Sequence, residues 1–333
     1  MSESIVVDLF HKLDGLIETV VKEKDELYLD SLAYVLRLAY FGAEDEEEAF
    51  SESFLQALQD FSDNLFAEEH TKQDIHRAIQ MALLKGMKKE ANRNHQMTPE
   101  SIALFVGYLI QKLVPDEKKH LRLFNPASGT GNLLHTVLNL LKHPVSAYAS
   151  EIDSTLLNIS VMVANILEQE IEYFHQDSLR PLLLDPVDIV ISDLPVGYYP
   201  DKEQAEKFQL KADEGHSYAH HLFIEQSLIY TKPGGYLIFL IPEFLFTSDQ
   251  AKKLNQFLHD NAHIVGLFQL SDSTFKKKEM KKSIFVLRKR GEHTKNVKQP
   301  LLVMLPSLKD TPKMENILAQ INEWFKEEAE NLA

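Results

Sequence analysis

Two glycines and two acidic side chains, each placed after a short apolar run, are the residues of this chain best suited to bind a ligand. The loop NPASGTGNLL, residues 125 to 134, leads from an apolar run into a helical pattern. Gly129 and Gly131 let its backbone turn sharply and approach a ligand closely. Glu151 follows Gly131 by about 20 residues, the spacing at which an acid can hydrogen-bond ribose hydroxyls. Asp177 follows the next apolar run, where a carboxylate can accept a hydrogen bond from an exocyclic amine.

The loop departs from two common nucleotide-binding motifs. A dinucleotide-binding loop has a third glycine three residues after the second, where this chain has Leu134. A phosphate-binding P-loop ends in Gly-Lys-Ser or Gly-Lys-Thr, which is absent here. Taken alone, the loop is also compatible with a glycine-rich turn that binds nothing, and its spacing to Glu151 is what favours a ligand with a ribose.

These residues lie in a segment where β-rich and helical patterns alternate. The β-rich runs are RLF at 122 to 124, SAYAS at 146 to 150, IEYF at 171 to 174, DIVIS at 188 to 192, YLIFLI at 236 to 241, IVGLFQL at 264 to 270 and SIFVLRK at 283 to 289. The helical patterns cover about 132 to 143, 154 to 168 and 218 to 231, with one amphipathic helix over 313 to 332. This alternation predicts a mostly parallel, doubly wound α/β sheet whose ligands bind beyond the carboxyl ends of the strands.

The first 95 residues have a different composition and predict an acidic helical domain. Residues 1 to 70 hold 18 Asp or Glu against 4 Lys or Arg, residues 71 to 333 hold 32 against 31, and all 13 prolines lie from Pro99 onward. Apolar residues recur every three or four positions in four stretches, which predicts four amphipathic helices. The boundary is expected near residues 86 to 97, giving domains of residues 1–95 and 96–333.

Composition excludes several classes of protein. The chain has 333 residues, a formal net charge of -15, 44% hydrophobic residues and no cysteine. The lack of cysteine excludes disulfides, thiolate nucleophiles and cysteine-bound metals, and suits a reducing cytosol. The N-terminus lacks the basic region of a signal peptide, and no apolar run approaches the ~20 residues of a membrane span. We therefore expect a cytoplasmic protein without a membrane segment.

The glycine loop and the acids Glu151 and Asp177 are accompanied by two further segments, MTPESIALF at 97 to 105 and SDLPVGYYP at 192 to 200. With these motifs the chain resembles the class I S-adenosylmethionine-dependent methyltransferases. Within that class the chain is similar to the adenine-specific DNA methylases related to type I restriction modification subunits, especially their YtxK-like stand-alone members. The resemblance covers about residues 92 to 290. It implies a seven-stranded Rossmann-like sheet, S-adenosyl-L-methionine as cofactor, and methyl transfer to an exocyclic amine, N6 of adenine in DNA.

The resemblance also implies which residues hold the cofactor. The family's Thr-Pro corner, here Thr98 and Pro99, packs against the methionine end, whereas the residues alone predict a helix N-cap at Thr98. The matched positions of the glycine loop are Asn125, Ala127, Gly129, Gly131, Asn132 and Leu133. The family usually has aspartate where this chain has Asn125. The other matched positions are the ribose acid Glu151, the adenine-packing Ile152, and Asp177, Ser178 and Leu179 at the adenine edge.

The family's catalytic motif, Asn-Pro-Pro-Phe/Tyr or its variant with aspartate first, here reads Asp193, Leu194, Pro195 and Val196. By this match the Asp193 side chain and the Leu194 carbonyl accept the amine hydrogens while the nitrogen attacks the methyl group. Val196 replaces the aromatic residue that stacks on the flipped base. Tyr198 or Tyr199 could supply that stacking, or both could be ordinary loop aromatics.

Charge and histidine patterns bear on partners. Residues 252 to 298 hold 12 Lys or Arg against 4 Asp or Glu and include the predicted last hairpin, which could grip phosphates or guard an edge strand with solvated charge. The acidic run at 42 to 50 predicts a solvated helix start or a protein-binding surface. His216, His220 and His221 have near-helical spacing but no acidic ligand beside them, so we expect no metal site.

The leading hypothesis is a methyltransferase that binds nucleic acid, DNA in preference to RNA, with a protein partner as a further expectation at the helical domain. One alternative is a regulatory protein that binds the cofactor without catalysis, because Leu194 and Val196 depart from the motif. The other is methylation of RNA or of a protein glutamine.

Overall fold

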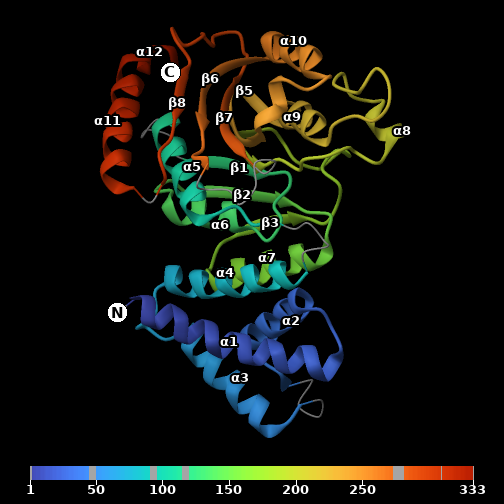
Figure 1. Ribbon diagram of the computed structural model, residues 1–333, viewed down its shortest axis with the longest axis vertical. Coiled ribbons are helices and arrows are strands. Elements are labelled where there is room, and N and C mark those ends of the chain that lie inside the picture. Colours follow the sequence, from blue (N-terminus) through green and yellow to red (C-terminus); the bar gives the residue numbers. More distant parts are fainter. Residues whose placement is uncertain are drawn as a thin grey trace. The chain divides into compact units, whose positions relative to one another are not determined.

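The computed structural model describes residues 2–44, 50–90, 96–114, 120–272, 281–308 and 310–332 (Figure 1). The chain forms two compact units. Unit 1 comprises Met1–Thr98, Gly129–His135 and Asp153–Ile171, and unit 2 comprises Pro99–Ser128, Thr136–Ile152 and Glu172–Ala333. Unit 1 therefore takes up two later segments in addition to the N-terminal helices. Most of the acidic run, at 45–49, and part of the predicted domain boundary, at 91–95, lie outside the described residues.

Unit 1 is a helical assembly with one apolar core. Its described helices are α1 (Ser2–Lys24), α2 (Tyr28–Phe41), α3 (Glu52–Leu65), α4 (Lys72–Lys89) and α7 (Ser154–Ile166). The apolar residues that recur every three or four positions, such as Leu13, Leu32 and Phe61, are buried together with Val163 of α7. All four helices predicted in the N-terminal region are present.

Unit 2 contains the sheet. Its strands are β1 (Leu121–Asn125), β2 (Val145–Ser150), β3 (Ile171–Phe174, whose first residue is grouped with unit 1), β4 (Val187–Asp193), β5 (Thr231–Pro242), β6 (Ala262–Gln269), β7 (Lys282–Lys289) and β8 (Leu301–Met304). They lie in the order β3-β2-β1-β4-β5-β7-β6-β8. The pairs of β1 with β2 and β4, and of β4 with β5, are parallel, whereas β7 runs antiparallel to β5 and β6.

The described sheet has eight strands rather than the seven predicted. All seven predicted runs form strands, and the additional one, β8, pairs in parallel with β6. Leu302 and Met304 of β8 are exposed, at 71% and 77%. A half-exposed edge strand of four residues carries too short a pattern to be recognised from its sequence.

Helices cover both faces of the sheet in unit 2. The described helices that lie wholly in this unit are α5 (Glu100–Leu113), α8 (Lys202–Ala205), α9 (Ala219–Ile229), α10 (Ala251–Asn261), α11 (Thr311–Glu327) and α12 (Ala329–Leu332), with a 3-10 turn, η3 (Glu243–Phe246); α6 (Asn132–Leu140) is divided between the units. On one face Phe239 of β5 packs with α9 and α10. On the other, the Phe105 ring of α5 meets the Phe268 ring of β6 at 5.4 Å. No helix among the described residues has the length and apolar composition to cross a membrane.

Two predicted helix boundaries are wrong. Helix α5 begins at Glu100 with Pro99 as its N-cap, because Pro99 has an extended ψ of 140° and its carbonyl accepts the first helical bonds, so Thr98 is not the cap. The C-terminal segment forms two helices instead of one. Helix α11 ends at Glu327, and the carboxylate of Glu328, buried in the fold, accepts from Lys298 N at 3.1 and 3.2 Å.

Five of the described histidines are buried: His76, His135, His220, His221 and His263. Burial lowers the pKa of all five, and most strongly those of the first four. Burial, aided by the nearby His135, lowers the pKa of His76 to about 3, and burial lowers the pKa of His135 to about 4. In unit 2, burial lowers the pKa of His220 to about 3 and that of His221 to about 4. These four rings are therefore neutral in the folded protein near pH 7.

These histidines predict loss of stability in mild acid. An unfolded histidine titrates near pH 6.5, so between about pH 6.5 and 4 the unfolded chain binds protons that the folded chain does not. The contribution of these neutral histidines to the free energy of unfolding is thus fully present above about pH 6.5. It is lost as the pH drops toward 4, by roughly 2 kcal/mol or more for each deeply buried ring. Urea unfolding at pH 7.5, 6.0 and 5.0 measures this, and His76→Gln should flatten the profile whereas His11→Gln, at an exposed position of α1, should not. An unchanged profile in His76→Gln would contradict the assignment.

Candidate functional site

The loop after β1 begins with an asparagine that shapes the turn. Asn125 is buried, and its Oδ1 accepts a hydrogen bond from Ala127 N at 3.2 Å. Ser128 N then donates to Ser150 O, at the end of β2, at 3.0 Å. An aspartate at position 125 would accept the same bond from Ala127 N, so the neutral amide preserves this turn while removing one negative charge.

The two glycines of the loop belong to unit 1 and have left-handed backbones. Gly129 has a φ of +55° and Gly131 a φ of +79°, conformations that favour glycine. A Cβ at Gly129 would have nothing within 4 Å, so this part of the backbone is open. A Cβ at Gly131 would clash with the side chains of Ser160 and His135.

Three other predicted cofactor residues, Thr98, Asn132 and Leu133, are buried in the same unit. The Asn132 Nδ2 donates to Thr98 O at 2.5 Å, and the Asn132 Oδ1 accepts from Gln80 Nε2 at 2.6 Å. The side chain of Asn132 is thus held on both sides where the loop enters α6. The structure brings Thr98 and Asn132 together and adds Gln80.

Glu151 and Ile152 follow β2 in unit 2. Glu151 N donates to Phe174 O at 3.2 Å, which anchors the residue to the end of β3. The Glu151 Oε1 accepts from Ile152 N at 2.9 Å. Ile152 is 67% exposed, so an exposed apolar side chain follows Glu151 directly.

The loop after β3 is tied to the loop after β1. The buried Ser178 donates through Oγ to Pro126 O at 2.6 Å. Asp177 accepts from Leu179 N through Oδ1 at 2.9 Å and from the Tyr199 hydroxyl through Oδ2 at 2.5 Å. Burial, together with the Asp177 carboxylate, raises the pKa of Tyr199. Tyr199 is therefore a buried support for Asp177.

Asp193, at the end of β4, forms an ion pair with Lys282 at the start of β7. The Lys282 Nζ donates to Asp193 Oδ1, and the two side chains are only 12% and 19% exposed, respectively. Leu194 N donates to Leu240 O at 3.2 Å, which continues the pairing of β4 with β5. The acceptor predicted for an amine thus has a cation beside it.

The residues after Pro195 differ in exposure. Val196 is 47% exposed and Tyr198 60% exposed, whereas Tyr199 is buried. The Tyr198 ring stacks on Tyr218, with centroids 4.9 Å apart and planes 14° apart. Of the two tyrosines predicted for stacking, Tyr198 is the one open to a ligand.

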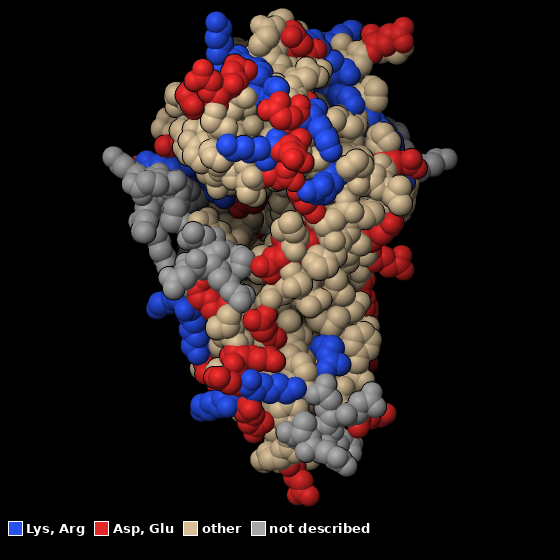
Figure 2. Space-filling view, turned by 90° about the vertical axis from the view of Figure 1, so that its right-hand side faces the viewer, with Lys and Arg blue, Asp and Glu red and all other residues tan. Residues whose placement is uncertain are grey.

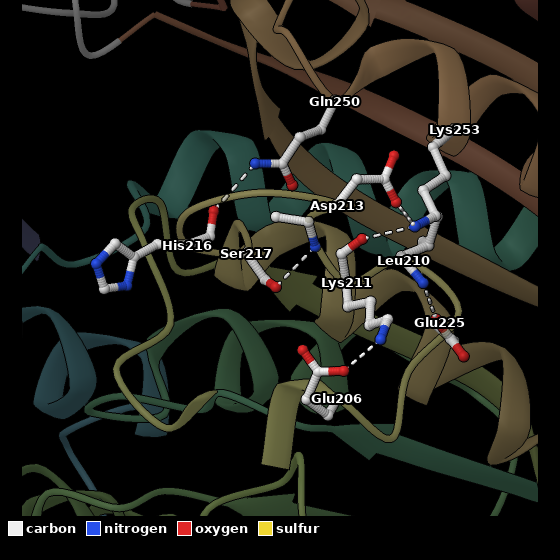
Figure 3. Close-up of polar contacts among 10 residues, drawn as sticks. Glu206, Leu210, Lys211, Asp213, His216, Ser217, Glu225, Gln250 and Lys253 are labelled. Atoms are coloured by element: carbon white, nitrogen blue, oxygen red, sulfur yellow. Dashed lines mark hydrogen bonds and ion pairs between the residues drawn. The ribbon is translucent and has the colours of Figure 1, made fainter. Parts of the chain in front are cut away.

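A polar network holds the loop that leads from α8 to Tyr218 (Figure 3). Glu225 of α9 accepts from Gln209 N and Leu210 N at 2.9 and 2.8 Å. Lys253 of α10 donates to Lys211 O at 2.8 Å and pairs with Asp213 at 2.6 Å. Further along, Gln250 Nε2 donates to His216 O at 3.0 Å, and Ala212 N donates to Ser217 Oγ at 2.9 Å. These bonds fix the backbone that carries Tyr218.

Two of the three histidines of this region lie beside Tyr218, and the third lies beside Tyr198. The ring centroids of His220 and His221 lie 5.0 and 5.3 Å from that of Tyr218, and the His216 ring lies 5.8 Å from Tyr198. In the described part of the chain, no three histidine, aspartate or glutamate side chains form a group that could hold a metal ion.

Charges of both signs mix on the surface shown in Figure 2. Blue and red side chains alternate over the described atoms of that face, and neither sign forms a continuous field there. Part of the basic stretch that could grip phosphates or guard an edge strand, residues 273 to 280, lies outside the described residues.

Comparisons with known proteins identify the family. The model of the N-6 DNA methylase family matches residues 73–330. The chain belongs to the N-6 DNA methylase family. It is 48% identical over 315 residues to the uncharacterized protein YtxK of Bacillus subtilis, covering 93% of this chain and 95% of that protein.

Solved structures of similar proteins have the same fold. A Listeria monocytogenes protein assigned to the class I S-adenosylmethionine-dependent methyltransferases superposes with a TM-score of 0.89 and 39% identity, over 97% of this chain and 99% of that one. The type I restriction-modification methyltransferase subunit of Streptococcus thermophilus gives a TM-score of 0.62 at 14% identity, over 96% and 77%. The chain thus has a class I methyltransferase fold, and its family and relatives support S-adenosylmethionine-dependent methyl transfer.

Sequence reasoning missed Lys282, Gln80 and Tyr218. Lys282 precedes a β-rich run and looks like one more residue of a basic stretch, because its place beside Asp193 depends on the pairing of β7 with β5 and of β5 with β4. Tyr218 was seen only as part of a helical pattern. Gln80 carries no local signal, since a glutamine on an amphipathic helix is ordinarily solvated.

The hydrogen bond from Tyr199 to Asp177 predicts that removing the Tyr199 hydroxyl destabilises the fold. Tyr199→Phe should lower the free energy of unfolding by about 1 kcal/mol, because it leaves a partly buried carboxylate oxygen of Asp177 without its donor. Urea unfolding checks this, with Tyr148→Phe as control because the described contact of Tyr148 is made by its ring, 4.8 Å from the Arg122 guanidinium. Equal losses in the two variants would contradict a special role for the Tyr199 hydroxyl.

Proposed function

We propose that this protein transfers the methyl group of S-adenosylmethionine to N6 of adenine in DNA. The observation that carries the proposal is the order of four features along the chain: the glycine loop after β1, Glu151 after β2, Asp177 after β3 and Asp193 at the end of β4. In parallel α/β sheets, ligands bind beyond the carboxyl ends of the strands. Membership in the N-6 DNA methylase family supports adenine as the substrate.

The residues present fit the cofactor. Around Gly129 the backbone is open enough for a close approach, with nothing within 4 Å of a Cβ position. Glu151 supplies a carboxylate for ribose hydroxyls, and Asp177 one for the exocyclic amine of the cofactor's adenine. The exposed Ile152 side chain offers an apolar surface to the adenine ring. When bound, the cofactor supplies a methyl group made electrophilic by the neighbouring sulfonium.

Asp193 and the Leu194 carbonyl would bind the substrate amine. An amine attached to an aromatic ring is a poor nucleophile, because its lone pair is delocalised into the ring. Two acceptors that hold the amine hydrogens favour a tetrahedral nitrogen and stabilise the positive charge that develops during attack. Lys282 orients the Asp193 carboxylate through the bond to Oδ1.

Tyr198 would take the stacking role that Val196 cannot fill. Extruding a base from a duplex costs a few kcal/mol, and stacking on an aromatic ring is worth about 1–3 kcal/mol per base. Tyr198 is exposed and supported from behind by Tyr218, which is held in the network around Glu225 and Lys253. A DNA base is thus our proposed ligand of this tyrosine, and the acidic helical region is our proposed contact for a protein partner.

The ion pair of Asp193 with Lys282 favours a second candidate, a cofactor-binding protein without catalysis. A cation next to the carboxylate weakens it as an acceptor and opposes positive charge on a bound amine. RNA or a protein glutamine as the methyl acceptor is a further candidate, since both present planar amines or amides.

Cofactor binding is tested by calorimetry with S-adenosylmethionine. Glu151→Ala should weaken binding about tenfold or more, because two ribose hydroxyls lose a charged acceptor. Glu172→Ala, at an exposed position of β3, is the matched control and should bind like the wild type. Absence of binding by the wild-type protein would refute the proposed cofactor.

Catalysis is tested with labelled cofactor and separate DNA, RNA and protein fractions. We expect label in DNA adenine, and Asp193→Ala should lower the turnover number on the order of 100-fold while cofactor affinity stays unchanged. Asp260→Ala, at an exposed site on α10, serves as the control. Label in RNA or protein would reassign the substrate, and label in no fraction would favour the protein without catalysis.

A further inference from the structure

A buried polar network lies behind the second half of the glycine loop, entirely within unit 1. His135, on the first turn of α6, is fully buried. Its Nδ1 lies 2.6 Å from Gln169 Oε1, and its Nε2 lies 3.2 Å from Ser160 Oγ. Because an amide oxygen can only accept, Nδ1 carries the proton and Nε2 accepts from the Ser160 hydroxyl. Gln169 Nε2 donates back to His135 O at 3.0 Å, so both the ring and the backbone of His135 are held.

This network meets the loop at Gly131. The Ser160 hydroxyl and the His135 ring fill the space that a Cβ at Gly131 would need, so they lie directly against the loop backbone. His135 N donates to Gly131 O at 2.8 Å. The left-handed backbone of Gly131 is therefore held by the Ser160 and His135 side chains and by the first turn of α6.

A second contact reaches the loop from helix α4. Gln80 Nε2 donates to Asn132 Oδ1 at 2.6 Å, and Asn132 Nδ2 donates to Thr98 O at 2.5 Å. These two bonds define which way the Asn132 amide points. One turn before Gln80, His76 lies with its Nε2 3.5 Å from the Gln80 amide, and its ring contacts the His135 ring edge-on at 6.0 Å.

We infer that Gln80 and His135 are positioning residues for the glycine loop, and that helix α4 thereby sets the affinity of the loop for S-adenosylmethionine. Gln80 holds the Asn132 side chain, and His135 with Ser160 holds the Gly131 backbone. Between them they leave Gly129, the open glycine, as the place where a ligand can approach. The cofactor part of this inference rests on the proposed function, whereas the positioning of the loop does not.

A polar network in this place has an energetic consequence. Buried amides and imidazoles lose their hydration, and each stabilises the fold only while its hydrogen bonds are complete. Gln80→Leu would leave Asn132 Oδ1 buried without its donor, which frees the Asn132 side chain to rotate. A loop with more conformations must lose more entropy when it binds a ligand, so its affinity falls.

Two measurements test the inference on the full-length protein. Gln80→Leu should weaken binding of S-adenosylmethionine and of S-adenosylhomocysteine about tenfold by calorimetry, equivalent to about 1.4 kcal/mol. In the protein without added cofactor, the same change should speed amide hydrogen exchange at residues 129 to 133. Gln80→Asn, which keeps the amide but withdraws it from Asn132, is a milder variant with a smaller expected effect in the same direction.

Ile79→Val is the matched control for general destabilisation of α4. Ile79 is buried at 1% exposure in the core of unit 1, so the change loosens the same helix without touching Asn132. If Gln80→Leu alters affinity and exchange no more than Ile79→Val does, the inference is overturned while the proposed cofactor stands. If the wild-type protein binds no cofactor, the proposed function fails, and the exchange comparison still decides whether Gln80 positions the loop.

Discussion

Hydrogen bonds between the loops at the carboxyl ends of β1, β2 and β3 are the interactions on which the candidate site in unit 2 depends. Ser128 N binds Ser150 O, and Ser178 Oγ binds Pro126 O, so the loop after β1 is held from two sides. Tyr199 extends the connection by donating to Asp177. A buried polar group without a partner costs about 1–3 kcal/mol, so moving one of these loops alone would break a hydrogen bond and destabilise the fold. Strand order brings the loops together, and these bonds define their conformations.

The same sheet places a cation beside the proposed catalytic carboxylate at the end of β4. Parallel pairing of β4 with β5, and antiparallel pairing of β5 with β7, place the start of β7 beside Asp193. Lys282 stands there, and the resulting pair is largely removed from water. Removing one partner from such a pair leaves an uncompensated charge, so each residue constrains the other. An amine that binds at Asp193 must therefore share the carboxylate with Lys282. The catalytic proposal requires that Asp193 still accept from the amine, whereas the alternative is that the ion pair prevents it.

How much the sequence could predict depended on how local each signal was. The helices of unit 1 and seven of the eight strands follow from patterns within a few residues, and the left-handed backbones of Gly129 and Gly131 agree with the turn expected from their residue type. The strand β8 was missed because four half-exposed residues carry little pattern. Lys282 and Gln80 were missed for a different reason. Lys282 meets Asp193 across 89 positions and Gln80 meets Asn132 across 52, and such pairings follow from tertiary packing alone.

The network behind the glycine loop can position it only while its histidine stays neutral. With Nδ1 donating to Gln169, the neutral His135 ring presents an acceptor at Nε2, which the Ser160 hydroxyl satisfies. Protonation would turn Nε2 into a second donor and place a positive charge behind a loop proposed to hold a sulfonium. Burial lowers the pKa of His135 to about 4, so this does not occur near pH 7. The desolvation from which we predict acid sensitivity therefore also preserves the donors and acceptors that hold His135.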